Sequence, residues 1–265
     1  MEVFGSMLFI AVTLLPTFLL WIYINKYDQN KEPIGVLVKL FFGGVLSAIA
    51  TIIISGIVEG FIPGFSDYVV NIDVAGFLYV FFGIAFIEEI SKLTMIYLFG
   101  WKDKNLDETY DVALYSMLVA LGFATFENIL YCMEGDFGTA IVRLFTAVPG
   151  HVIDGAFMGY FLYKARTTKR KKYFFLALMV PSLTHALYDF LCYDETDLGF
   201  LLFIILVIVE FIVAIKLIKN LSKNNRSLFE RKASFCSNCG SQISTKYCIN
   251  CGKLNENQKN VLKFF

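Results

Sequence analysis

Glu88, Glu89 and Lys92 lie within a stretch of otherwise apolar residues and could together perform acid–base chemistry. On a helix, Glu88 and Lys92 share one face and can form an ion pair, whereas Glu89 points about 100° away and needs a partner on another helix. Unequal surroundings would make one carboxyl group the better proton acceptor, as acid–base catalysis requires. A purely structural ion pair is the alternative interpretation.

Two further apolar stretches carry polar side chains of the same kind. Glu127 and Asn128 interrupt the segment GFATFENILY, and Glu127 is a candidate ligand or base. Arg143 precedes the segment PGHVID, in which His151 and Asp154 share a helical face. The Pro-Gly pair before His151 is expected to loosen the helix there.

His185 and Asp189 are four residues apart in the segment HALYD, so their side chains project together from a helix, as metal-binding or water-binding pairs do. An ionisable group at membrane depth costs about 2.5–3.5 kcal/mol and usually faces the interior of a bundle. The sequence therefore predicts one shared polar cavity for these side chains. Gly155 and Gly159 form a GxxxG pair, which predicts close helix packing rather than chemistry.

The composition places these residues in a membrane. Of 265 residues, 57% are hydrophobic and 17% are charged, and the mean hydropathy is +0.63. We predict an all-α polytopic membrane protein with seven spans, because about 20 apolar residues cross a bilayer. The expected spans are Met7–Ile24, Ile34–Val58, Val74–Gly100, Tyr110–Cys132, Thr139–Tyr163, Tyr173–Cys192 and Leu198–Ile218.

The charges of the loops predict the orientation. Lys and Arg in the loops occur at 25–33, 101–108, 164–172 and after 216. The loops between these contain Asp and Glu but no Lys or Arg. The positive-inside rule then gives a multi-pass protein with its N-terminus outside and its C-terminus in the cytoplasm. The first apolar run is expected to be a span rather than a cleaved signal peptide. The basic loop is expected to face anionic lipid, and no nucleic acid is expected as a partner.

The C-terminal part has a different character. Residues 1–221 are expected to form the membrane domain, 222–233 a polar linker, 234–253 a cytoplasmic zinc ribbon and 254–265 a short tail. The ribbon is predicted because two CxxC pairs supply four thiolates suited to tetrahedral Zn²⁺. These are Cys236, Cys239, Cys248 and Cys251. Four protein ligands leave no open position for chemistry, so the ribbon is expected to dock a cytoplasmic protein or to regulate the enzyme.

Four motifs in order resemble the PrsW family of bacterial intramembrane proteases: EEISK, GFATFENILY, RLFTAVPGH and HALYD. Together they extend over Glu88–Asp189. The resemblance implies an endopeptidase of the bacterial plasma membrane that cuts single-span membrane proteins, such as anti-sigma factors, to start a signalling cascade.

The PrsW family is similar to the wider group of CAAX endopeptidases and Abi-like proteins. This chain has Glu127 where those enzymes commonly place a histidine, which favours glutamate-activated water over an all-histidine zinc centre. An active-site divalent metal remains an alternative.

We predict that Glu88 or Glu89 is the general base on a water held by His151 and His185. Glu127 and Asp189 would orient this catalytic cluster, with Lys92, Asn128, Arg143 and Asp154 in support.

Two other functions fit the same buried groups. An ion- or proton-coupled transporter would use them as a relay, but the sequence shows no inverted repeat. A scaffold without catalytic activity would use the ribbon to bind a partner, and such a protein would be expected to lack one of the catalytic positions.

Overall fold

The computed structural model describes residues 2–65, 70–228, 234–243 and 250–251. The chain divides into two compact units, Met1–Arg226 and Ser227–Phe265, and the division falls within the predicted polar linker. Asn225 ties the end of the first unit to the membrane helices, because its Oδ1 accepts a hydrogen bond from the Tyr110 amide at 2.9 Å. Cys248 lies outside the described residues.

The first unit consists of helices. They are α1 (Glu2–Lys26), α2 (Ile34–Phe61), α3 (Val74–Tyr79), the π-helical turn η1 (Val80–Ala85), α4 (Phe86–Phe99), α5 (Thr109–Glu134), α6 (Phe137–Phe145), α7 (Ala147–Thr168), α8 (Lys172–Cys192) and α9 (Asp197–Lys223). Among the described residues, seven helical segments are long and apolar enough to cross a membrane. The predicted all-α polytopic membrane fold is therefore confirmed.

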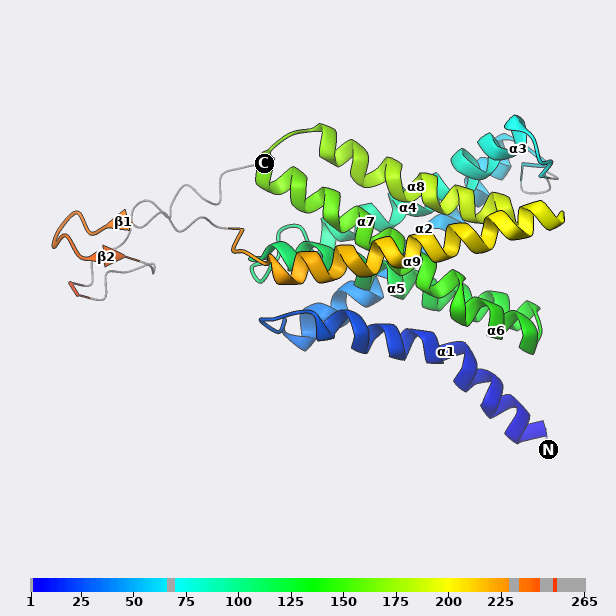
Figure 1. The fold of residues 1–265 in the computed structure, drawn as a ribbon, viewed down its shortest axis with the longest axis horizontal. Helices are drawn as coiled ribbons and strands as arrows, with labels where there is room; N and C mark the ends of the chain where they lie inside the picture. The colour runs from blue at the N-terminus through cyan, green and yellow to red at the C-terminus, as the bar shows by residue number, and fades with distance from the viewer. Residues whose placement is uncertain (1, 66–69, 229–233, 244–249, 252–265) are drawn as a thin grey trace. The chain divides into compact units, whose positions relative to one another are not determined.

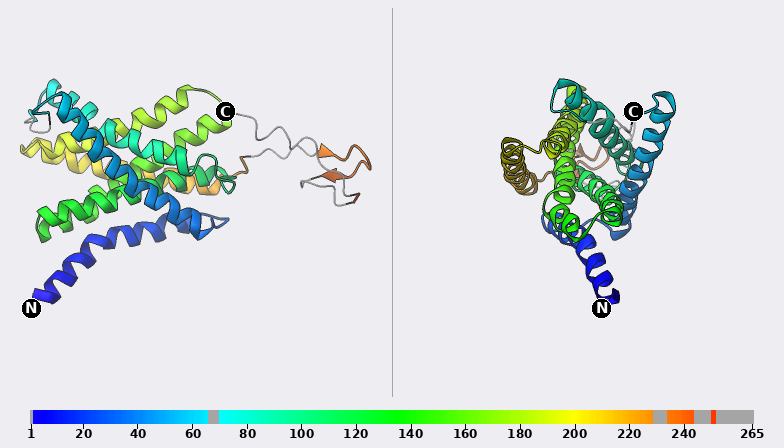
Figure 2. Two further views of the ribbon diagram at one scale, coloured as in Figure 1. Left: turned by 180° about the vertical axis from the view of Figure 1, so that it is seen from behind. Right: turned by 90° about the vertical axis from the view of Figure 1, so that its right-hand side faces the viewer.

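The long helices run side by side (Figures 1 and 2). Helix α3, helix α6 and the N-terminus of α1 all lie at the same end of the bundle. We call this the α3 end; α9 finishes at the opposite end. Of the most apolar stretch in each helix, 83% is buried in α5 but only 17% in α9. The exposed side chains of α9, such as Ile205, Ile208 and Ile212, are apolar, as a lipid-facing surface requires.

Helix α5 forms the core of the bundle and packs against α2 and α7. Glycines make this packing close: a Cβ on Gly44 of α2 would lie 2.0 Å from the Val119 carbonyl oxygen of α5. A Cβ on Gly159 of α7 would lie 2.5 Å from Ala113 Cα, and one on Gly155 would lie 2.9 Å from the Ser116 carbonyl oxygen. The prediction that Gly155 and Gly159 serve helix packing is confirmed.

Two of the predicted spans are not continuous α-helices. The third contains η1, a π-helical segment that ends directly before the turn carrying Glu88 and Glu89. The fifth breaks at Thr146, between α6 and α7, rather than at Pro149 and Gly150 as predicted. Pro149 is tolerated because it lies in the first turn of α7, where the missing N–H would have no intrahelical partner.

The described part of the second unit holds two short strands. Ser234–Phe235 (β1) pairs antiparallel with Gln242–Ile243 (β2). Between them, Gly240 adopts a φ of 70°, and its amide donates to the Cys236 carbonyl at 2.8 Å. This left-handed conformation favours glycine, which accounts for the glycine after the CxxC pair.

Candidate active site

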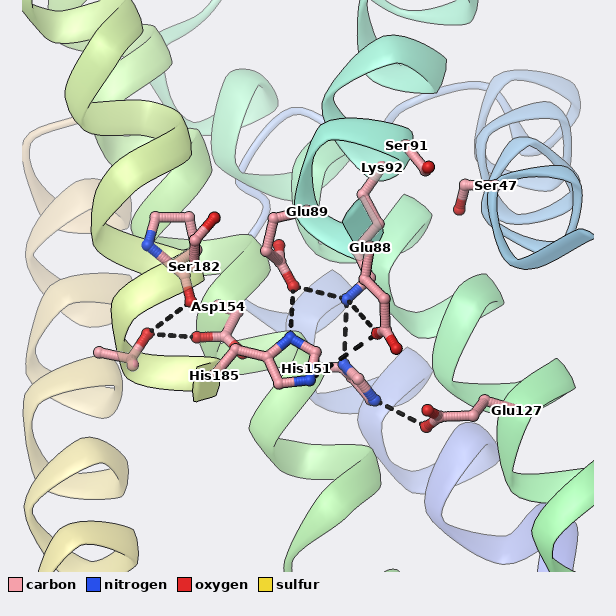
Figure 3. Close-up of polar contacts among 12 residues, drawn as sticks. Ser47, Glu88, Glu89, Ser91, Lys92, Glu127, His151, Asp154, Ser182 and His185 are labelled. Atoms are coloured by element: carbon pink, nitrogen blue, oxygen red, sulfur yellow. Dashed lines mark hydrogen bonds and ion pairs between the residues drawn. The ribbon is translucent and has the colours of Figure 1, made fainter. Parts of the chain in front are cut away.

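Four helices bring the predicted polar side chains to one place inside the bundle (Figure 3). The carboxylates and the lysine of the EEISK motif come from α4, Glu127 from α5, the first histidine from α7 and the second from α8. Glu88, Glu89, Lys92, His151, Asp154 and His185 are all buried. The predicted shared polar cluster is therefore present, although each of its residues is distant from most of the others in the sequence.

Lys92 lies at the centre of this cluster. Its Nζ forms the predicted ion pair with Glu88, at 3.7 Å from Oε2, and a closer one with Glu89, at 2.6 Å from Oε1, which the sequence did not predict. Residues three apart on a helix are also neighbours, and the Glu89 side of α4 faces the partners from α7 and α8. The ammonium also contacts His151 Nδ1 at 3.0 Å and lies 4.1 Å above the centre of the Phe123 ring.

The contact with Lys92 determines the proton arrangement of His151. An ammonium group has no lone pair, so Nδ1 must accept this hydrogen bond, which places the ring proton on Nε2. Nε2 lies 2.8 Å from Glu127 Oε2, and the carboxylate accepts that proton's hydrogen bond. His151 is thereby held in one orientation between Lys92 and Glu127.

His185 contacts carboxylates with both ring nitrogens. Nδ1 lies 3.0 Å from Glu89 Oε1, so Glu89 has the partner on another helix that the sequence predicted. Nε2 lies 3.4 Å from Asp189 Oδ2 and 3.7 Å from Glu88 Oε2. The His185 ring packs edge-on against that of His151, with centroids 5.0 Å apart. A proton on either nitrogen of His185 can therefore pass to a neighbouring carboxylate.

Arg143 holds Glu127 from the other side. Its Nη2 donates to Glu127 Oε2 at 2.8 Å, its Nε donates to Asn128 Oδ1 at 3.0 Å, and the guanidinium stacks on Tyr131 at 4.1 Å. Asn128 in turn donates to the Thr13 carbonyl oxygen at 2.8 Å. Arg143 is thus linked to His151 through Glu127, and Asn128 is linked to it through Arg143 and Glu127.

Asp154 of α7 also belongs to the cluster, and Thr184 Oγ1 of α8 donates to its Oδ1 at 2.6 Å. Glu210 of α9, which interacts electrostatically with Asp154 and His185, was not among the predicted site residues. Glu210 is 8% exposed, and its Oε1 has no hydrogen-bond partner among the described residues. Glu210 is a carboxylate within the apolar sequence of α9, and an ionisable residue in such a span is costly to bury. This cost could have identified Glu210 as a candidate from the sequence.

The donor chemistry of the cluster fits a divalent metal. Two sets of side chains each offer ligand atoms within 4.8 Å of one another. They are Glu89, His151, Asp154 and His185 in one set and Glu88, Glu127 and His151 in the other. Imidazole nitrogen and carboxylate oxygen are the ligands of catalytic zinc, and two buried oxygens, Glu88 Oε2 and Glu89 Oε2, lack a hydrogen-bond partner.

The tail holds a second group of candidate ligands. The Cys236, Cys239 and Cys251 sulfurs lie within 4.8 Å of one another, and Cys236 Sγ is 3.4 Å from Cys251 Sγ. Backbone amides of Asn238 and Cys239 donate to the Cys236 sulfur and lower the pKa of its thiol. A lowered thiol pKa favours the thiolate form that binds metal.

The fold and the site define a polytopic membrane protein with a buried acid–base centre. Residues 32–215 match the PrsW family of intramembrane metalloproteases. The chain is 30% identical over 211 residues to Protease PrsW of Oceanobacillus iheyensis, covering 79% of this chain and 94% of that protein. It is 33% identical over 186 residues to Protease PrsW of Bacillus subtilis, covering 69% and 81%.

Protease PrsW of Clostridioides difficile is 26% identical over 230 residues, covering 82% of this chain and 93% of that protein. No solved structure matches the chain. The chain therefore belongs to the PrsW family of intramembrane metalloproteases, and it is a membrane-embedded peptidase.

Proposed function

We propose that this peptidase cuts single-span membrane proteins, such as anti-sigma factors, by attack of a glutamate-activated water. The observation that carries the proposal is the different situation of two adjacent carboxylates. Each carboxylate has a buried Oε2 without a hydrogen-bond partner, but their other contacts differ. Glu89 Oε1 lies 2.6 Å from Lys92 Nζ and 3.0 Å from His185 Nδ1, whereas Glu88 Oε2 lies 3.7 Å from Lys92 Nζ and 3.7 Å from His185 Nε2. The less tightly held carboxylate is the better proton acceptor, so Glu88 is the general base and Glu89 positions its neighbours.

In this mechanism Glu88 removes one proton from a water as the water oxygen bonds to the scissile carbonyl carbon. The protonated Glu88 then delivers that proton to the leaving amide nitrogen as the C–N bond breaks. The Lys92 ammonium, 3.7 Å from Glu88, supplies positive charge where the tetrahedral oxyanion develops. His151 and His185 hold the reacting water, and Glu127 and Asp189 orient the two rings.

A divalent metal would use the same side chains and would replace a contact of His151, because Lys92 and Glu127 engage both of its ring nitrogens. The ligand sets that contain His151 would hold the metal, and it would supply a Lewis acid that polarises the carbonyl or lowers the pKa of a bound water.

We further propose that the enzyme lies in the bacterial plasma membrane with its N-terminus outside and its C-terminus in the cytoplasm. The alternation of basic and acidic loops supports this orientation. The CxxC pairs would bind Zn²⁺ in a cytoplasmic ribbon, and this ribbon would dock a protein partner. The three described cysteine sulfurs, close to one another, support the metal site.

The test is product identification. The purified full-length protein in proteoliposomes is mixed with a panel of single-span membrane proteins, and new termini are mapped by mass spectrometry. We expect cuts within or beside the spanning segment of a subset of the panel; no cut in any member would overturn the proposed substrate class. Bound zinc measured in wild type and in Cys251→Ser should fall by one ion per chain in the variant, and an unchanged zinc content would overturn the ribbon.

A further inference from the structure

A cavity of about 160 Å³ runs along α2 and η1 and ends at Glu88. Thr51 and Ser55 line it from α2, Tyr79 and Gly83 from α3 and η1, and Phe65 from the segment that follows α2. Ser55 lies in the last two turns of α2, and Phe65 lies in the segment that connects α2 to α3, so these two lining residues belong to the α3 end of the bundle and Glu88 lies deeper along α4.

Two buried oxygen atoms on this cavity have no hydrogen-bond partner among the described residues: Thr51 Oγ1 and Glu88 Oε2. Thr51 is unusual in this respect. Thr94 and Thr125, also within spans, donate to the carbonyl four residues earlier at 2.7 Å and 2.6 Å. A buried hydroxyl and a buried carboxylate without partners are costly unless water satisfies them.

The size and polarity of the cavity suit water. A water molecule's share of liquid volume is about 30 Å³, so about five molecules fit into 160 Å³. Ordered internal water also needs polar partners, about two to four for each molecule, and the lining side chains of Thr51, Ser55, Tyr79 and Glu88 carry polar groups. A dry apolar cavity would not present such groups.

The walls of the cavity are fixed by specific contacts. The ring of Phe65 leans against Gly83, where an added Cβ would lie 2.7 Å from Phe65 Cζ. Tyr79 donates through its hydroxyl to the Phe65 carbonyl oxygen at 2.9 Å, and the two rings lie 5.0 Å apart. The π-helical turn and its glycine therefore leave room beside α2 directly before the Glu88 turn.

We propose that this cavity is the path by which hydrolytic water reaches Glu88, with the buried Thr51 hydroxyl as a polar group on its α2 wall. The inference rests on the proposed function and specifies where its co-substrate enters. Each cleavage consumes one water: its oxygen forms the new carboxyl C–O bond, and the hydrogens end on the two products. The lipid-facing surface cannot resupply it, since side chains such as Ile52 and Ile53 on the outer face of α2 are apolar.

The first test measures water access without any substrate. In the full-length protein in membranes, Thr51→Cys is compared with Ile53→Cys, whose position is 58% exposed on the outside of the bundle. A charged, water-soluble thiol reagent is added, and mass spectrometry assigns modification to the introduced cysteine. The reagent reacts with the thiolate, and a thiolate forms only where the thiol is in contact with water. We therefore expect Thr51→Cys to be modified at least about tenfold faster than Ile53→Cys. Equal rates at the two positions would overturn the path.

The second test fills the cavity. Ser55→Leu, placed one helical turn from Thr51, should slow modification of Thr51→Cys and lower the cleavage rate about tenfold, whereas the control Ile53→Leu should change neither. Full cleavage by a folded Ser55→Leu protein would overturn the path and leave the peptidase intact. A wild-type protein that cuts no single-span protein would overturn the proposed function, and the modification rates would still decide whether water reaches Thr51.

Discussion

The Lys92 ammonium and the Glu89 carboxylate form an ion pair of 2.6 Å whose side chains are 1% and 0% exposed. Such a pair is costly to assemble in a membrane, because both charges leave water. It persists because Lys92 also contacts His151 and Glu89 also contacts His185. One buried ion pair on α4 therefore fixes both histidines, which come from α7 and α8.

Removing one member of this pair should be more damaging than removing both. We expect Lys92→Met to destabilise the protein by about 3–5 kcal/mol, because it leaves the Glu89 charge buried without its cation. The double variant Glu89→Gln/Lys92→Met should recover much of that loss. Thermal unfolding in detergent measures both. A double variant less stable than Lys92→Met alone would contradict this assignment.

Arg143 is expected to act as a positioning residue for Glu127. Arg143→Met should lower kcat about 10–100-fold with little change in KM, as loss of an outer partner typically does. Arg143→Lys should be intermediate, because a lysine keeps the charge but cannot contact Glu127 and Asn128 together. The exposed Arg170→Met serves as the control in the same cleavage assay. An Arg143→Met enzyme with wild-type kcat at an unchanged Tm would argue against this role.

Glu32, in the loop between α1 and α2, should make stability depend on pH. Burial raises the pKa of its carboxyl from 4.5 to about 7, against the opposing hydrogen bond donated by Tyr115. The folded protein then holds a proton that the unfolded chain releases. The contribution of the protonated Glu32 to the free energy of unfolding is complete below about pH 4.5 and is lost as the pH rises through about 7.

The measurement is the Tm of wild type and of Glu32→Gln, which keeps an acceptor for Tyr115. The variant should gain on wild type between about pH 5 and about pH 8. A difference in Tm that does not change over this interval would show that Glu32 does not titrate there.

Close packing of α7 on α5 gives a further prediction. Gly159→Ala would place a Cβ 2.5 Å from the Ala113 backbone and should destabilise by about 1–3 kcal/mol. Gly56→Ala is the matched control, because a Cβ there meets nothing within 4 Å. Unfolding curves of the two variants decide the matter. Equal stability would mean that the two helices are not in close contact at Gly159.

The sequence predicted the spans and the residues of the cluster because both depend on residue type and spacing. A run of about twenty apolar residues predicts a membrane span, and ionisable groups within spans usually face the interior of the bundle. The motifs that resemble PrsW predicted the family. The closer of the two partners of Lys92 could not be predicted in the same way, because residues three and four apart on a helix can both form an ion pair and the sequence does not say which contact is shorter.

Other features depend on tertiary packing. The π-helical turn at Val80–Ala85 carries no residue pattern that separates it from an α-helix, and the break at Thr146 precedes the proline expected to cause it. The cavity beside Glu88 is lined by Phe65 and Gly83, which come from different elements and pack against each other. No local sequence signal joins two such positions.

The most direct test of the central claim compares cleavage of one single-span substrate by wild type and by Glu88→Gln in proteoliposomes. Glutamine keeps the shape of the side chain but cannot accept the proton from water. The account predicts a loss of about 10²–10⁴-fold in kcat at an unchanged Tm. A Glu88→Gln enzyme that cleaves at the wild-type rate would contradict the assignment of Glu88 as the general base.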